Sequence, residues 1–154
     1  MELWATLYAT IWLVFLEIWL GFTPIAPPVP LYLHVVLGVA IVALAARNFV
    51  GLRATRTVGR IKRTARATLA LSVLMAVLGG AIYLDLGSSW IVVGGLSITD
   101  GLRFLHFVNA MAILSQVSAT AVVYDVWEEK EFEKGSAPGE IPPPPSPAGG
   151  TTTP

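Results

Sequence analysis

Residues 31–50, LYLHVVLGVAIVALAARNFV, form a run of 20 residues that is apolar apart from His34 and the pair Arg47 and Asn48 near its end. At a rise of about 1.5 Å per residue, a helix of this length crosses the hydrocarbon core of a bilayer. The run follows Pro30, and proline suits the first turn of a helix. It therefore predicts a transmembrane helix and decides the class of fold for the whole chain.

Three further apolar stretches have similar lengths. Residues 3–22 precede the proline-rich segment TPIAPPVP, and residues 67–84 and 102–127 flank the segment DLGSSWIVVGGLSITDG. The composition agrees, because 55% of the 154 residues are hydrophobic and only 13% are charged. We therefore expect an all-α, integral membrane four-helix bundle in residues 1–134, with residues 135–154, rich in proline, glycine and threonine, as a disordered tail.

The basic residues predict the orientation of the bundle. Seven of the ten lie between Arg47 and Arg66, and the expected connection 52–66 is the only strongly basic one. Connections rich in Lys and Arg stay on the cytoplasmic side. We therefore expect a multi-pass protein of the cell membrane, surrounded by lipid bilayer, with both termini cytoplasmic (N-in/C-in).

The residue types exclude several chemistries. The chain has no cysteine, which rules out disulfides, thiolate metal sites and covalent c-type haem attachment. It has no glycine-rich phosphate loop and no nucleophile elbow. A juxtamembrane basic segment suits anionic lipid or a protein partner, and we expect no nucleic-acid partner.

Two histidines carry the main functional hypothesis. His34 lies in the second predicted helix and His106, in LRFLHFVNA, lies in the fourth. They are predicted roughly 6 and 9 Å below the outer ends of these helices, at nearly one depth. Two such imidazoles can serve as metal ligands, the axial pair of one haem b (iron protoporphyrin IX) per chain. The alternative is that each histidine only forms a hydrogen bond to a neighbouring helix.

Three other residues join this hypothesis. Glu17 is predicted about 9 Å below the outer end of the first helix, where it could accept the free N–H of an axial imidazole or simply tie two helices together. Gly38 is one turn from His34 and would relieve crowding against the macrocycle. Arg103 is one turn from His106 and could meet the haem propionates or extend to the interface.

Asn109 and Gln116 share a helix face with His106, at spacings of three and ten residues. Polar stripes of this kind form hydrogen bonds between helices more often than proton paths. We therefore expect both residues to bind a neighbouring helix.

Two stretches, PLYLHVVLG (residues 30–38) and the region 71–114 that ends in LRFLHFVNAMAIL, resemble one half of the haem A synthase family. The resemblance covers about residues 30–125 and implies a compact, half-size bundle whose second and fourth helices each carry a haem-ligating histidine. The family usually has a glutamate one turn before the first histidine and an arginine directly after it. Pro30 and Val35 occupy those positions here. The resemblance therefore implies the scaffold and haem binding more than haem A synthesis.

These observations favour a membrane b-type cytochrome for electron transfer in a respiratory chain, with a redox partner or larger membrane complex and a possible homodimer. One alternative is an enzyme, a haem A synthase-like haem-modifying monooxygenase. The other is an accessory subunit of a respiratory complex that binds no haem. Since two histidines fill both axial positions of the iron, electron transfer is favoured over oxygen activation.

Overall fold

The computed structural model describes residues 2–22, 29–86, 91–93 and 96–135. Four helices make up the fold: α1 (Leu3–Phe22), α2 (Val29–Ala54), α3 (Gly59–Tyr83) and α4 (Ile98–Gly135). Each is long and apolar enough to cross a membrane, which confirms the expected four-helix membrane fold. Two short antiparallel strands, β1 (Ile91–Val93) and β2 (Leu96–Ser97), precede α4. The all-α expectation had not included these strands.

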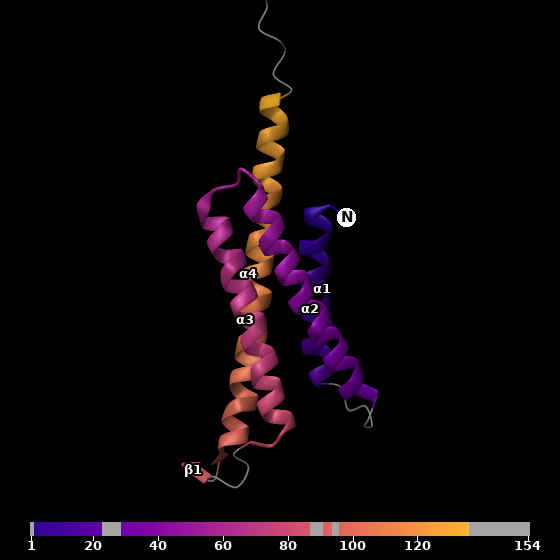
Figure 1. The fold of residues 1–154 in the computed structure, drawn as a ribbon, viewed down its shortest axis with the longest axis vertical. Helices are drawn as coiled ribbons and strands as arrows, with labels where there is room; N and C mark the ends of the chain where they lie inside the picture. The colour runs from indigo at the N-terminus through magenta and orange to yellow at the C-terminus, as the bar shows by residue number, and fades with distance from the viewer. Residues whose placement is uncertain (1, 23–28, 87–90, 94–95, 136–154) are drawn as a thin grey trace, which may run out of the picture.

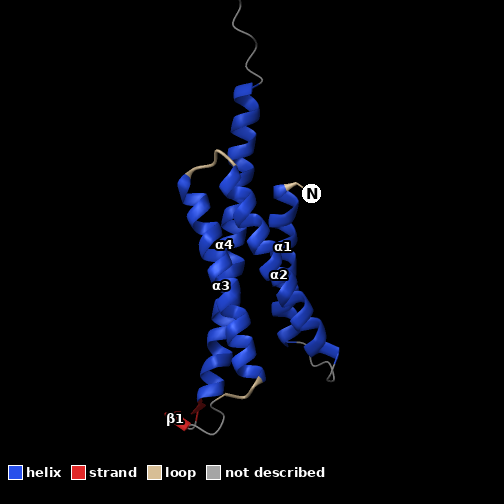
Figure 2. Cartoon of the chain, in the orientation of Figure 1, coloured by secondary structure: helices blue, strands red, loops and turns tan. Residues whose placement is uncertain are grey.

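The helices form a ring in chain order. α1 packs against α2 and α4, and α3 also packs against α2 and α4, so α2 and α4 face each other across a diagonal. The start of α1, the α2–α3 connection and the end of α4 lie at one end of the bundle (Figure 1). This is the up-and-down arrangement that short connections produce. In Figure 2, α4 extends beyond the other helices at this end.

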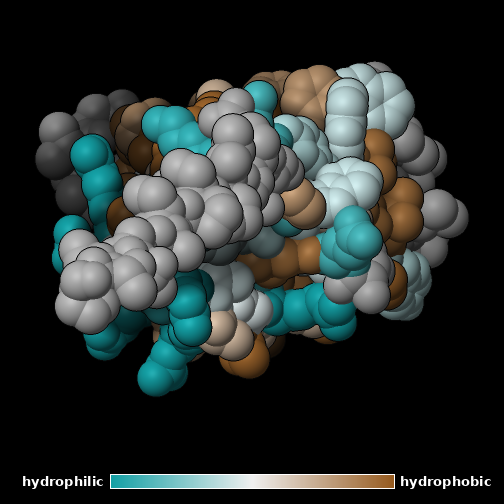
Figure 3. Space-filling view, turned by 90° about the horizontal axis from the view of Figure 1, so that it is seen from above, coloured by the Kyte–Doolittle hydropathy of each residue, from teal (hydrophilic) through white to brown (hydrophobic). Residues whose placement is uncertain are grey.

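Four helix ends differ clearly from the prediction. The expected 15-residue basic connection is wrong, because α2 continues to Ala54 and α3 already begins at Gly59. Arginine and lysine are good helix formers, so most of the basic segment extends the two helices. Lys62 Nζ donates hydrogen bonds to the carbonyls of Arg53 and Thr55, which would otherwise be unpaired at the end of α2. In Figure 3, hydrophilic side chains gather around this end of the molecule.

Helix α4 begins at Ile98 instead of residue 102 because Ser97 forms a reciprocal cap. Ser97 Oγ accepts a hydrogen bond from the backbone N–H of Asp100 at 3.1 Å, and the Asp100 carboxylate accepts one from the Ser97 backbone N–H at 3.0 Å. The helix also continues to Gly135 rather than ending at Trp127. The predicted tail, residues 135–154, otherwise lies outside the described residues.

The core divides into two levels. At the end that holds the N-terminus, residues from all four helices pack together, and Val14, Ile41 and Ile113 form a second cluster deeper in the bundle. Asn48 is buried in the first level, where its Nδ2 donates to Thr10 Oγ1 at 3.0 Å and Thr6 Oγ1 donates to its Oδ1 at 2.5 Å. These bonds attach α1 to α2. The first-level residues are Leu7, Leu52, Ile61, Ala65, Val117, Ala121 and Tyr124.

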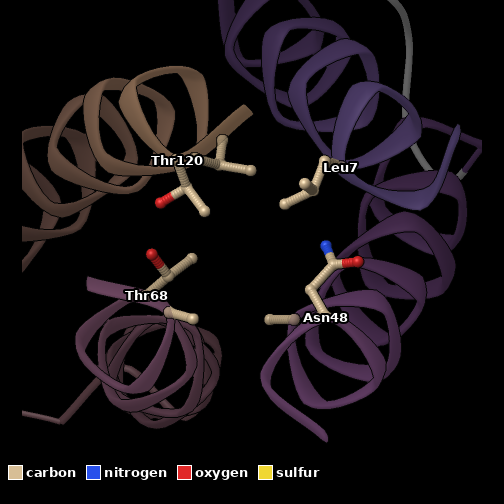
Figure 4. A pocket seen from close by; sticks show the side chains of 7 residues that line it. Leu7, Asn48, Thr68 and Thr120 are labelled. Carbon is tan, nitrogen blue, oxygen red and sulfur yellow. The ribbon is translucent and has the colours of Figure 1, made fainter. Parts of the chain in front are cut away.

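A small cavity of about 10 Å³ lies at the centre of this level, with Asn48, Thr68 and Thr120 around it (Figure 4). A cavity of this size holds at most about one water molecule. It is therefore too small for a cofactor.

Candidate functional site

The two histidines meet across the diagonal of the bundle. The ring centroids of His34, on α2, and His106, on α4, are 5.9 Å apart, and the ring planes are tilted by 51°. Both side chains are half-buried. The structure thus brings together the two residues that the sequence placed at one depth.

Glu17 joins this pair from α1. The Nδ1 atom of His34 pairs with Oε2 of Glu17, whose side chain is only 10% exposed. Glu17 Oε1 is buried and has no hydrogen-bond partner among the described residues. The contact places three helices around one site and leaves Nε2 as the nitrogen of His34 that can bind a ligand.

His106 packs against α3 at Gly79. A Cβ atom added to Gly79 would lie 3.3 Å from His106 Cε1, which is tighter than most real contacts. Glycine at this position therefore lets the imidazole pack closely against α3. The Nδ1 atom of His106 is buried and has no hydrogen-bond partner within the described part of the chain. The sequence pattern does not identify Gly79 as a contact of His106. The contact of Gly79 with His106 depends on how α3 is rotated about its axis, which no local sequence pattern indicates.

An open groove of about 230 Å³ lies beside His34 and is lined by Leu20, Gly21, Leu31 and His34. Its walls are apolar apart from the imidazole. Nearby, Phe22 on α1 and Phe107 on α4 make an edge-to-face contact with centroids 5.7 Å apart. The site therefore combines one polar layer with an apolar, lipid-accessible margin.

Neither of the other two candidate residues interacts with a histidine ring in the described part of the structure. Gly38 faces open space, because an added Cβ would meet no atom within 4 Å. Arg103 has a side chain that is 65% exposed, and its guanidinium lies 3.5 Å from the Asp100 carboxylate on the same helix. Both residues remain within one turn of a histidine, so their expected roles next to a bound group stay predictions.

Asn109 and Gln116 bind α3, as expected. Asn109 Nδ2 donates to the backbone carbonyl of Leu71 at 2.9 Å, and Gln116 Oε1 accepts a bond from Thr68 Oγ1 at 3.4 Å. These bonds fix α4 against α3 and hold His106 on the inner side of its helix.

Comparison with known proteins finds no matching family model, no matching curated protein and no matching solved structure. The resemblance to the haem A synthase family therefore depends on the sequence features alone. What the site can do must be argued from its own residues.

Proposed function

We propose that this protein is a membrane b-type cytochrome that holds one haem b between His34 and His106 and transfers electrons in a respiratory chain. The 5.9 Å separation of the two imidazole centroids carries the proposal. A ligating nitrogen lies about 2 Å from a transition metal and the ring centre about 1 Å further, so two imidazoles that bind one ion from opposite sides would have centroids about 6 Å apart. Rotation about the line that joins the ligating nitrogens leaves both bonds unchanged, so a 51° tilt is acceptable.

The small number of ligands favours haem over a bare metal ion. Among the described residues, no group of three or more His, Cys, Asp or Glu side chains could hold a metal. Zinc and non-haem iron sites take three or four protein ligands. A porphyrin supplies four nitrogens of its own, so two axial histidines complete its coordination.

The neighbouring residues have roles that suit this cofactor. Glu17 accepts the Nδ1–H of His34, which fixes the tautomer and makes the imidazole more basic. Arg103 would pair with a propionate at the membrane edge. A bound haem would supply reversible one-electron chemistry, and His34 and His106 would be the residues that hold it.

The macrocycle also needs room. The groove beside His34 and the open space at Gly38 offer apolar surface on α2. A porphyrin is larger than this groove, so we expect side chains around the histidine pair to move aside when haem binds, while the two imidazoles keep their separation of about 6 Å.

The orientation proposed for the protein follows from its charges. Six of the ten basic residues lie between Arg53 and Arg66, around the α2–α3 connection, at the end that also holds the start of α1 and the end of α4. The positive-inside rule assigns this end to the cytoplasm of a cell membrane. Because the histidine layer lies nearer the opposite end of α2 and α4, the electron would reach or leave the haem in the outer half of the bilayer.

The visible spectrum of the purified protein, recorded reduced minus oxidised, tests the proposal together with the identity of the extracted haem. A sharp alpha band and one protoheme per chain are expected. A stable protein that stays colourless after haem is supplied would instead favour an accessory subunit. Extracted haem with a formyl or hydroxyethylfarnesyl group would favour the haem-modifying enzyme.

A further inference from the structure

The first turns of α3 present a row of arginines on the side turned away from the bundle. Arg60, Arg63 and Arg66 are all exposed and follow one another at intervals of three residues, so they share one face of the helix. We call these three residues the arginine face. The buried side of α3, which includes Ile61 and Ala65, lies opposite at 3.6 residues per turn. Because α3 packs against α2 and α4, the arginine face points outward from both.

No carboxylate neutralises the arginine face. Between Glu17 and Asp85 the chain contains no Asp or Glu, so α2, α3 and their connection offer no acidic partner. The carboxylates at the end of α4 belong to a helix that packs on the opposite side of α3. The salt bridges found among the described residues are His34–Glu17 and Arg103–Asp100, and neither involves the arginine face. Three positive charges on one surface therefore favour an anion.

The arginine face lies at the level of the lipid headgroups. Helix α3 has 25 residues, which correspond to about 37 Å, whereas the hydrocarbon core is about 30 Å thick. The apolar part of this helix begins at residue 67, directly after Arg66. The guanidinium groups therefore lie at the edge of the core, where phosphate groups are found. Guanidinium binds phosphate through two parallel hydrogen bonds.

The same side of α3 continues into the membrane as an apolar strip. Val73, Leu74 and Val77 are 49%, 45% and 63% exposed, and Ala70 is also exposed. The helical repeat places these residues below the arginine face. From Arg66 to Val77 the helix rises about 16 Å, and one leaflet of the hydrocarbon core is about 15 Å thick. This side of α3 thus has the length and the division into charged and apolar parts that a phospholipid requires.

We propose that the arginine face and the apolar strip bind an anionic phospholipid, with its phosphate on the guanidinium groups and its acyl chains along the strip. A soluble protein would approach from the water, where it would first meet the projecting end of α4 (Figure 2). The arginine face instead points sideways, into the plane of the membrane, where anionic lipid headgroups lie. The apolar strip adds a contact that a free phosphate ion cannot use. The lipid site does not depend on haem binding.

Lipid retention by the purified full-length protein tests the proposal. The immobilised protein is equilibrated in detergent with equal amounts of phosphatidylglycerol and phosphatidylcholine of identical acyl chains and then washed. Mass spectrometry counts the retained lipids. The test variant is Arg63→Gln, Arg66→Gln, because glutamine is also a good helix former. Lys130→Gln, Lys134→Gln is the matched control, since it removes two positive charges from α4 at the same end of the bundle. Circular dichroism establishes that both variants retain their helices.

The wild-type protein and the control variant should retain phosphatidylglycerol in preference to phosphatidylcholine. This preference should fall about fivefold for each arginine removed, as expected for one basic side chain at an anionic membrane surface. A wild-type protein without preference would overturn the proposal, as would an unchanged preference in the arginine variant or an equal loss in the control. An excess of inorganic phosphate in the wash should release no more lipid than chloride of equal ionic strength. Greater release by phosphate would show that the arginine face binds a free anion instead of a lipid.

Discussion

His34 and Glu17, from neighbouring helices, pair through Nδ1 and Oε2 at the same level at which His34 approaches His106. The pairing turns the Nε2 edge of His34 away from α1 and leaves it available as a ligand. A carboxylate behind an axial imidazole stabilises the more positive, oxidised state of a bound metal. In the proposed haem site, this contact would therefore lower the reduction potential of the iron.

Replacing Glu17 by Gln should raise the reduction potential of the bound haem by some tens of millivolts. The amide oxygen of Gln can still accept the His34 N–H, but it carries no negative charge, and a hydrogen bond to a charged acceptor is about twice as strong as a neutral one. Potentiometric titration measures the shift. Asp125→Asn, at the far end of α4, is the control and should leave the potential unchanged. A Glu17→Gln protein with the wild-type potential would show that the carboxylate is only a structural tie.

Gly79→Ala should weaken haem retention, whereas Gly80→Ala should not. A Cβ at Gly79 would lie 3.3 Å from His106 Cε1 and would push the imidazole away from α3, but a Cβ at Gly80 meets nothing within 4 Å. The two variants gain the same methyl group in adjacent positions of one helix, so their helix propensities change equally. Haem-to-protein ratio after detergent washing provides the measurement. Equal haem retention in both variants would mean that the close contact at Gly79 does not position His106.

Gly38→Ala should weaken haem binding without changing the fold of the haem-free protein. A Cβ at Gly38 meets no atom within 4 Å, so the variant should fold normally without haem. If the macrocycle packs on this position as proposed, haem affinity should fall. Titration of haem into the apo forms of both proteins gives the two dissociation constants, and an unchanged constant would remove Gly38 from the site.

Arg103→Gln should change the reduction potential of the bound haem but not the stability of the fold. The Arg103–Asp100 pair is exposed, and such pairs contribute about 0–1 kcal/mol to stability. Loss of a positive charge near the propionates should lower the reduction potential, because the oxidised site loses one repulsive neighbour. Denaturant titration and potentiometry of the same sample measure both effects. A large loss of stability with no change in potential would contradict the assignment.

Asn48→Ala should destabilise the bundle by about 1–2 kcal/mol, since it removes three hydrogen bonds between α1 and α2 and leaves a void at a buried position. Ser115→Ala is the matched control, because exposed Ser115 bonds only within its own helix, to the Met111 carbonyl. Its effect should stay within about 0.5 kcal/mol. Unfolding in detergent, followed by circular dichroism, compares the two.

The sequence predicted the four helices and the layer of Glu17, His34 and His106 because both are local properties. A run of about 20 apolar residues identifies a span by itself, and an ionisable group within it marks a site by itself. The helix ends were predicted less accurately. The basic segment extends α2 and α3, and the Ser97–Asp100 cap moves the start of α4.

Relationships between helices could not be read from one chain. The ring order and the close packing of His106 on Gly79 depend on how each helix is rotated in the bundle. Helices that are apolar on every side give no strong periodic signal for that rotation. The apolar runs therefore determine which residues form the helices. The few polar contacts between helices determine how each helix is rotated relative to its neighbours.

Haem binding by the single variants His34→Ala and His106→Ala tests the central claim most directly. Tyr32→Ala and Phe104→Ala are matched controls, because each lies two residues from a histidine on the same helix with its side chain more than 60% exposed. Each histidine variant should lose the sharp alpha band of the reduced protein, while both controls retain it. An alpha band of wild-type position and intensity in either histidine variant would contradict ligation by the pair.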